Sequence, residues 1–375
     1  MVIGIDGNEA NVINRVGVST YAYELLRYFN SVASGDQQFV IYLRNTPSNE
    51  LPEQSKFFTY QIVKPDFMWS QLSLPINLYL GKKPDVFFSP AHYAPRFSPV
   101  PTVVTIHDLA YKLFPKEFLK GDLYKLNRWT EYSIRKASKV ICVSKHTKKD
   151  LVRLYPSVET KTDVVYNGFR SQKIKNKNLE LSPDSSESRI PIVNRENTNP
   201  YILFVGTIQP RKNVVSLISA FEIFSQSHPE YELKIVGKQG WLFNETMNKI
   251  ESSTVANKIA YLGFVEDLAL SDLYKNAYAT VLPSYYEGFG LPVLEAMSHG
   301  SPVIASNNSS LPEITGSAAL LCDPNDPQSI VTSLERLQDK KLRTDLIKES
   351  QKQVKLFSWE KCGAETLAVI RSAVA

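Results

Sequence analysis

The chain of 375 residues is long enough for two domains of ordinary size, each with its own hydrophobic core. Its hydrophobic content of 43% and charged content of 22% are typical of a soluble globular protein and exclude a fibrous or disordered chain. The net charge is +5, and no nucleic-acid-binding motif accompanies it, so nucleic acid is not an expected partner.

The cysteines and the first residues indicate a cellular compartment. Cys142, Cys322 and Cys362 are scattered and lack any C-x-x-C spacing, which argues against a disulfide framework and a zinc site. The chain opens with a strand pattern at Val2–Asp6, and no run of residues approaches the roughly 18 apolar residues of a membrane span. We therefore expect a cytoplasmic protein without a signal peptide or a membrane-spanning helix.

Short β-rich runs alternate with helical patterns, which predicts an α/β protein with parallel sheets built from βαβ units. The first series of expected strands comprises residues 2–6, 39–43, 57–63, 86–88, 103–106, 140–143 and 164–166. The second series comprises residues 201–205, 233–236, 259–262, 278–282, 303–305 and 319–322. The stretch between them is rich in Ser, Asn, Lys and Pro, which predicts a domain boundary. Two such domains place their ligands at the carboxyl ends of the strands, across a cleft.

In the first domain, two strand ends carry candidate ligand contacts. A loop over residues 11–17 follows the first strand, and Gly17 stands just before a helical pattern. His107 and Asp108 directly follow the run 103–106. A histidine there can donate a hydrogen bond to a sugar hydroxyl, although a His-Asp pair at a strand end is by itself more often structural.

Between Tyr111 and Tyr155, cations outnumber acids and alternate with apolar residues such as Phe114, Phe118 and Tyr124. Such a surface can rest on anionic lipid, each cation near the membrane contributing about 1 kcal/mol. The alternative is a solvated face above ordinary core residues.

The second domain begins with a strand at 201–205, followed by a loop that carries Arg211 and Lys212. Asn213 is the expected N-cap of the next helix, so the two cations lie at the carboxyl edge of the sheet. Together they can offset the charge of a diphosphate leaving group. Gly237 and Lys238 end the next strand, and the surrounding residues lack the G-x-x-x-x-G-K-[ST] pattern of a P-loop.

The segment Ser284 to Gly300 is the most informative. It predicts a tight loop at 287–290 and a helix that starts at Pro292 and stops at Gly300, so that the amides of Phe289, Gly290 and Leu291 point out of a positive helix end. Glu287 precedes this end and Glu295 lies one turn inside it. Because a carboxylate can accept paired hydrogen bonds from vicinal hydroxyls, each acid is a candidate clamp for a pyranose or a ribose.

These motifs, in this order, resemble the family-4 (group 1) retaining glycosyltransferases. The resemblance rests on the E-x7-E spacing of Glu287 and Glu295, the text V-G-T-I-Q-P-R-K-N at 205–213, His107-Asp108 and the loop at 11–17. It implies the GT-B fold, with two Rossmann-like parallel-sheet domains facing a central cleft and a C-terminal helix crossing back to the first domain. The implied segments are an acceptor domain at 1–170, a linker at 171–198, a nucleotide-sugar domain at 199–355 and a last helix at 356–375.

The resemblance also implies roles for the site residues. Glu287 binds hydroxyls of the donor sugar, Glu295 binds the nucleoside ribose, and His107 binds a donor hydroxyl near the reacting carbon. The remaining donor contacts come from Gly17, Arg211, Lys212, Gly237, Lys238, Phe289, Gly290 and Leu291. No D-x-D triplet occurs, so neither a metal nor another cofactor is expected. The resemblance then implies that the anomeric configuration is retained through front-face attack by the acceptor.

Within this family, the sequence resembles mannosyltransferase-like enzymes of bacterial surface-polysaccharide assembly. This resemblance implies GDP-mannose as donor and a saccharide or lipid-linked acceptor. The basic stretch at 111–155 adds the expectation of peripheral contact with the inner face of the plasma membrane, which would suit a lipid-linked acceptor. Tandem β/α domains would also suit a dinucleotide-dependent oxidoreductase, but no G-x-G-x-x-G follows either first strand. A sugar-nucleotide epimerase and a non-catalytic sugar-nucleotide binding protein remain as alternatives.

Overall fold

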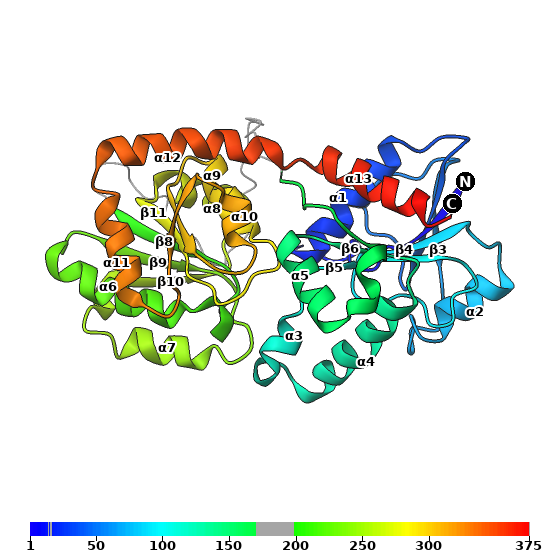
Figure 1. Cartoon of the computed structure of the whole chain (residues 1–375), viewed down its shortest axis with the longest axis horizontal. Helices are drawn as coiled ribbons and strands as arrows, with labels where there is room; N and C mark the ends of the chain where they lie inside the picture. The colour runs from blue at the N-terminus through cyan, green and yellow to red at the C-terminus, as the bar shows by residue number, and fades with distance from the viewer. Residues whose placement is uncertain (14, 16, 170–198, 375) are drawn as a thin grey trace, which may run out of the picture.

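The structure is a computed structural model that describes residues 1–13, 15, 17–169 and 199–374. These residues form two parallel sheets, each flanked by helices (Figure 1). The linker expected at 171–198 lies outside the described residues. Within the described part of the chain, no helix combines the length and the apolar character needed to cross a bilayer.

The first sheet has seven parallel strands in the order β3-β2-β1-β4-β5-β6-β7. Its strands are β1 Val2–Asp6, β2 Gln38–Leu43, β3 Phe58–Ile62, β4 Val86–Ser89, β5 Thr102–Ile106, β6 Lys139–Cys142 and β7 Thr162–Val164. The helices of this half are α1 Val18–Ser31, α2 Ser73–Leu80, α3 Ala110–Leu113, α4 Lys120–Lys136 and α5 Lys145–Leu154. β7 ends before the expected residues 165–166, because Tyr166 turns toward the second domain and its hydroxyl donates to Glu313 over 2.9 Å.

Both faces of the first sheet are covered. Val103 and Val104 are neighbours on β5, and successive side chains of a strand point to opposite faces. Val103 joins the apolar cluster that contains Leu25 of α1, while Val104 joins the cluster that contains Ile134 of α4. This burial on both sides explains why the strands read as continuous apolar runs in the sequence.

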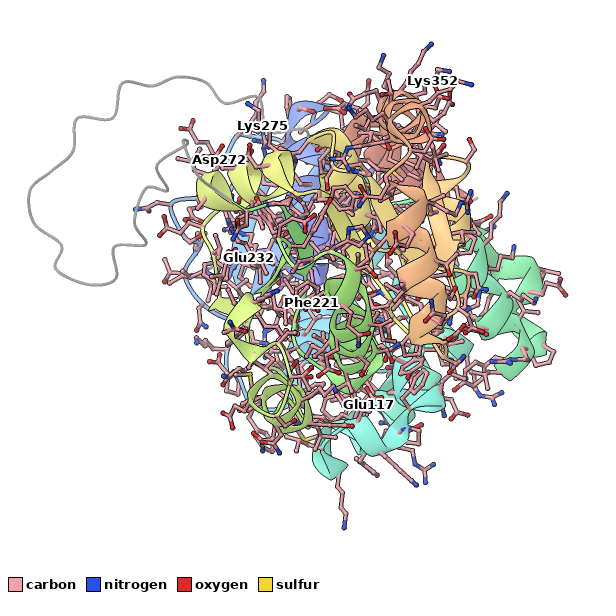
Figure 2. All side chains as sticks on the ribbon, turned by 90° about the vertical axis from the view of Figure 1, so that its left-hand side faces the viewer. Glu117, Phe221, Glu232, Asp272, Lys275 and Lys352 are labelled. Carbon is pink, nitrogen blue, oxygen red and sulfur yellow. The ribbon has the colours of Figure 1, made fainter. Side chains whose placement is uncertain are left out.

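The second sheet has six parallel strands in the order β10-β9-β8-β11-β12-β13. Its strands are β8 Tyr201–Val205, β9 Glu232–Val236, β10 Ile259–Gly263, β11 Ala279–Leu282, β12 Val303–Ser306 and β13 Ala319–Cys322. The helices are α6 Val214–Ser227, α7 Asn244–Glu251, α8 Asp267–Asn276, α9 Leu291–Ser298, α10 Leu311–Thr315, α11 Pro327–Arg336 and α12 Lys340–Gln353. Phe221 of α6 is fully buried, whereas Asp272, Lys275 and Lys352 are exposed on the outside of this half (Figure 2).

After α12 the chain crosses from the second half to the first, where the last helix, α13 (Trp359–Ser372), lies beside α1 (Figure 1). Trp359 and Ile370 belong to the same buried cluster as Ile3 of β1. A Cβ atom on Gly363 would lie 2.3 Å from the Tyr28 ring, so the glycine permits the two helices to pack closely. The end of the chain is therefore part of the core of the first domain.

The strand order of each sheet reverses once, between β1 and β4 and between β8 and β11. At such a switch point the loops that leave neighbouring strands diverge, and a crevice opens at the carboxyl ends. In the second sheet these are the loops that carry Lys212 and Glu287. The topology alone thus brings together two residues that are 75 positions apart.

Candidate active site

A buried ion pair marks the switch point of the second sheet. Nζ of Lys212 lies 2.5 Å from Oε1 of Glu287, and the two residues are 9% and 6% exposed. The hydroxyl of Ser284 donates to the same carboxylate oxygen over 2.8 Å. The loop after β8 and the loop after β11 therefore hold each other through a fully desolvated carboxylate.

Arg211 completes this cluster. Its Nη1 lies 3.7 Å from Oε2 of Glu287 and donates to the Tyr286 carbonyl over 3.0 Å. Burial by itself would raise the pKa of Glu287, but the charges of Lys212 and Arg211 outweigh it and hold the pKa below its ordinary value. Glu287 is therefore an ionised acceptor beside two cations, which is the combination that can bind both hydroxyls and phosphate oxygens.

The start of α9 follows directly. Gly290 occupies the N-cap position with φ +100°, a left-handed conformation that favours glycine, and Pro292 lies in the first turn. The helix begins at Leu291, one residue before the predicted start. The Phe289 ring is buried against Tyr166 and Phe357, so only the backbone of Phe289 is placed to approach a ligand.

Glu295 has its own surroundings on α9. Its Oε2 accepts a hydrogen bond from the Tyr274 hydroxyl over 2.8 Å, and burial raises the pKa of the Glu295 carboxyl. The side chain lines a cavity of about 90 Å³ together with Asp267 and His299. The two carboxylates of the E-x7-E motif thus have separate partners, as two clamps on different parts of one ligand require.

His107 faces this site from the first domain. Its Nε2 lies 2.8 Å from the Pro90 carbonyl, to which it can only donate. Burial, together with nearby His92, lowers the pKa of His107 to about 4, so the ring is neutral near pH 7. With Nε2 protonated, Nδ1 accepts hydrogen bonds. The structure therefore favours an acceptor role for the free nitrogen, whereas the sequence led us to expect a donor.

The two domains touch beside the Lys212–Glu287 ion pair. A Cβ atom on Gly288 would lie 2.0 Å from the His107 carbonyl oxygen, so the loop that carries Glu287 packs its backbone directly on the His107 strand end. Burial opposes ionisation of neighbouring Asp108, yet the charge of Arg211 helps to hold the Asp108 pKa below its ordinary value. Across the domain contact, Asp108 interacts electrostatically with Arg211 and Lys212, beside the ion pair of Lys212 with Glu287.

The other predicted contacts lie at the ends of strands and helices. Gly17 is the N-cap of α1 with φ +52° and has open space at its Cα. A side chain on Gly237 would meet the Gly206 carbonyl oxygen at 1.9 Å, so glycine permits β8 and β9 to end side by side. Nζ of Lys238 lies 4.7 Å from the centre of the Phe264 ring.

Asn213 occupies the predicted N-cap position of α6, but its side chain does not cap the helix. The residue is left-handed, with φ 58°, and its side chain makes no cap hydrogen bond. Its amide nitrogen instead donates to the carbonyls of Pro283 and Pro324 over 3.0 and 2.6 Å. Asn213 therefore fixes the loop that carries Arg211 and Lys212 to the loops after β11 and β13.

Sequence reasoning missed the residues that hold the domains together. Glu313 of α10 accepts the backbone N–H groups of Lys145 and His146 at the start of α5 over 3.1 and 2.9 Å. The Tyr286 hydroxyl donates to Oδ2 of Asp150 over 3.0 Å. Single glutamate and aspartate residues on helices carry no local signal of this kind, because the partners come from the other domain.

Comparisons with known proteins match both halves of the chain. The model described as Glycosyltransferase Family 4 matches residues 16–173, and the model described as Glycosyl transferases group 1 matches residues 185–353. The O-antigen chain mannosyltransferase B of Escherichia coli is 33% identical over 273 residues, which cover 71% of this chain and 68% of the relative. The O-antigen chain mannosyltransferase RfbU of Salmonella typhimurium is 27% identical over 63% of this chain and 61% of its own length.

Solved structures agree on the fold. A sucrose-phosphate synthase from Thermosynechococcus elongatus superposes with a TM-score of 0.73 at 20% identity, covering 99% of this chain and 98% of its own. WaaG, a glycosyltransferase involved in lipopolysaccharide biosynthesis, gives 0.67 at 15% identity, with 99% of both chains covered. Both sheets, the cleft-edge motifs and these matches lead to one conclusion: the chain belongs to the group 1 glycosyltransferases and has the GT-B fold.

Proposed function

We propose that this glycosyltransferase moves mannose, with retention of configuration, from GDP-mannose to a saccharide or lipid-linked acceptor in surface-polysaccharide synthesis. The observation that carries the proposal is the cluster of Lys212, Arg211 and Glu287 at the switch point, where the loop that carries Glu287 packs against the His107 strand end of the first domain. The choice of mannose is supported by relatives that are named O-antigen mannosyltransferases.

The cluster suits the leaving group and the transferred sugar together. Lys212 and Arg211 would stabilise the negative charge that develops on the diphosphate, and the amides at the start of α9 would add to it. Glu287 would accept hydrogen bonds from the sugar hydroxyls. Since these groups are already fixed by one another, little reorganisation is needed when charge develops.

The residues that would bind the remaining parts of the donor are assigned from their positions in the family motifs. Glu295 would hold the ribose hydroxyls, while Gly17, Gly237 and Lys238 would line the path of the phosphates and the nucleoside. The neutral ring of His107 would accept a hydrogen bond at Nδ1 from a donor hydroxyl near the reacting carbon.

Retention is proposed to follow from front-face attack. The acceptor oxygen bonds to the anomeric carbon on the side from which the phosphate departs, and the carbon–phosphate oxygen bond breaks. The leaving phosphate oxygen takes the acceptor proton. No side-chain nucleophile and no metal ion is assigned a step.

The two alternatives of other classes are less well supported. The family models and the O-antigen relatives favour a glycosyltransferase over a sugar-nucleotide epimerase or a non-catalytic binding protein. Product analysis separates all three, because only transfer attaches the sugar to a new acceptor.

The acceptor is proposed to be presented at the inner face of the plasma membrane. The basic stretch between Tyr111 and Tyr155 keeps Leu119 and Tyr124 exposed, as lipid contact would need. Phe114 and Phe118 do not belong to that surface, because their rings lie 6.1 Å from Tyr286 and 5.4 Å from Trp241 of the second domain. They line the domain contact instead.

A thermal-shift screen of nucleotide sugars tests the donor assignment. A ligand at 100 times its dissociation constant stabilises the folded protein by about 2.7 kcal/mol, which is readily measured. We expect GDP-mannose to raise the melting temperature more than UDP-glucose, UDP-galactose or UDP-N-acetylglucosamine. A larger shift with a uridine donor would contradict GDP-mannose.

A further inference from the structure

An exposed apolar surface lies on the outer end of the first domain, away from the catalytic cleft. It is carried by α2 and by two neighbouring loops. Its members, which we call the α2 surface, are Phe67 (70% exposed), Leu72 (45%), Ile76 (55%), Tyr79 (53%), Leu80 (84%) and Phe97 (66%). Figure 1 shows α2 at the edge of the first domain that is remote from the second.

Helix α2 is apolar on both sides, which is unusual for a helix at a protein surface. Leu74 and Leu78 are fully buried in a cluster with Trp69 and Phe87, so one side is already anchored in the core. Leu72, Ile76 and Leu80 follow each other at four-residue spacing and therefore line the opposite side. Exposed apolar patches of this kind mark sites of contact with a membrane or another macromolecule.

The surface continues from α2 to Phe97. The backbone N–H of Arg96 donates to the Ser70 carbonyl over 3.0 Å, which ties the Phe97 loop to the turn before α2. The backbone N–H of Phe97 donates to the Tyr132 hydroxyl of α4 over 2.7 Å. The apolar residues are thus held on one continuous side of the domain.

Cations border the α2 surface. Nζ of Lys83 lies 5.7 Å from the centre of the Tyr79 ring, and the Arg96 guanidinium lies 5.4 Å from the Phe97 ring. Lys82 is exposed beside Lys83. The nearby acids are engaged elsewhere: Asp66 pairs with Lys64 at 2.7 Å, and Asp85 accepts the Val2 N–H over 2.7 Å. Apolar side chains bordered by cations complement the acyl chains and headgroups of an anionic bilayer.

We propose that the α2 surface inserts into anionic phospholipid, and that it, rather than the basic stretch at 111–155 alone, anchors the enzyme. The segment from Pro90 to Phe97 connects this surface to the proposed active site. At one end the Pro90 carbonyl accepts a hydrogen bond from Nε2 of His107, and at the other end Phe97 is exposed. Resting on the proposed function, the surface would keep a lipid-linked acceptor close to the cleft.

Vesicle sedimentation tests the proposal. The full chain is mixed with vesicles of phosphatidylcholine alone or of phosphatidylcholine with phosphatidylglycerol, at low and high salt. We expect binding to the anionic vesicles that weakens with salt. The double variant Ile76→Ser with Leu80→Ser should bind the vesicles at least about tenfold more weakly, because two apolar side chains no longer enter the lipid. Lys82→Gln with Lys83→Gln should reduce binding to anionic vesicles only.

Matched controls make the outcome decisive. Leu268→Ser removes a similarly exposed leucine (56%) from α8 of the second domain and should bind vesicles like the wild type. Equal partition of the α2 double variant and Leu268→Ser would overturn the proposal. So would loss of binding only in Lys125→Gln with Arg128→Gln on α4, or a lipid-free dimer that the α2 variant abolishes, since the surface would then join two copies.

Activity separates this inference from the proposed function. Transfer to a soluble mannose disaccharide without vesicles should be unchanged in the α2 double variant. Transfer without vesicle binding would overturn only the lipid surface. Vesicle binding without transfer from any nucleotide sugar would overturn only the proposed function.

Discussion

Lys212 and Glu287 form a buried ion pair, with 2.5 Å between Nζ and Oε1, at the point where the strand order of the second sheet reverses. The pair joins the residue proposed to bind phosphate, Lys212, to the residue proposed to bind the sugar, Glu287, before any substrate arrives. Removing one partner leaves the other charge desolvated and unpaired, which is costly.

Glu287→Gln should reduce transfer far more than Glu295→Gln, because Glu287 is assigned to the sugar whose bond breaks. Losing a charged hydrogen bond in the transition state costs about 2–4 kcal/mol, or roughly 30- to 1,000-fold in kcat. Glu222→Gln, which breaks the ion pair with Lys249 outside the site, is the matched control and should keep its activity. Near-normal turnover of both motif variants would remove the assignment.

Lys212→Ala should weaken binding of GDP much more than binding of guanosine, because the proposed partner of the ammonium is phosphate. Calorimetry with both ligands measures the difference. The variant should also lose about 3 kcal/mol of stability, since Glu287 is left buried without its closest cation. Lys249→Ala serves as the control, and equal losses for GDP and guanosine would place Lys212 away from the diphosphate.

The two motif glutamates should affect stability with opposite dependence on pH. The pKa of Glu287 is lowered in the folded state, so its contribution is complete above the ordinary carboxyl value of 4.5 and is lost as pH falls through the lowered pKa. The pKa of Glu295 is raised, so its contribution is complete at low pH and is lost as pH rises through the raised pKa.

Thermal denaturation of the wild type and both Gln variants from pH 7 to about pH 2 measures these contributions. The wild type should be more stable than Glu287→Gln at pH 7, and the difference should shrink only below pH 4.5, as the pH falls through the lowered pKa of Glu287. Relative to Glu295→Gln, the wild type should gain stability as the pH falls through the raised pKa of Glu295 toward 4.5. Parallel changes for the two variants would show that the carboxylates share one environment.

Gly288→Ala should prevent the contact between the two domains at the reacting edge, since its Cβ would lie 2.0 Å from the His107 carbonyl oxygen. The two atoms must move apart, and a misplacement of about 1 Å at a reacting centre costs roughly a hundredfold in rate. Small-angle scattering should show a more open molecule. Gly121→Ala, where the added carbon meets open space, should change neither activity nor scattering, and an active Gly288→Ala would mean that this contact is dispensable.

The strands could be predicted because burial on both faces leaves continuous apolar runs, and every expected strand has a counterpart in the structure. The position of Arg211, Lys212 and Glu287 at the carboxyl edge follows from the same periodicity. Their contact does not, because it depends on β8 lying next to β11 in the sheet order. Strand order is set by long-range packing that local patterns do not encode.

The remaining differences are also tertiary. The Asn213 side chain bonds two proline carbonyls rather than its own helix, and Nε2 of His107 is occupied by the Pro90 carbonyl. Glu313 binds the start of a helix 167 residues earlier in the chain. Asn213 and His107 were recognised as candidates in the sequence, whereas Glu313 was not, and in all three cases the partner lies far away in the chain.

The most direct test is to incubate the protein with GDP-mannose and a synthetic mannose disaccharide in the presence of a chelator, and to read the new anomeric signal by NMR. We predict an α-linked product, formed without divalent metal and lost in Glu287→Gln. A β-linked product, a strict requirement for magnesium or manganese, or no transfer from any nucleotide sugar would contradict a retaining, metal-independent mannosyltransferase.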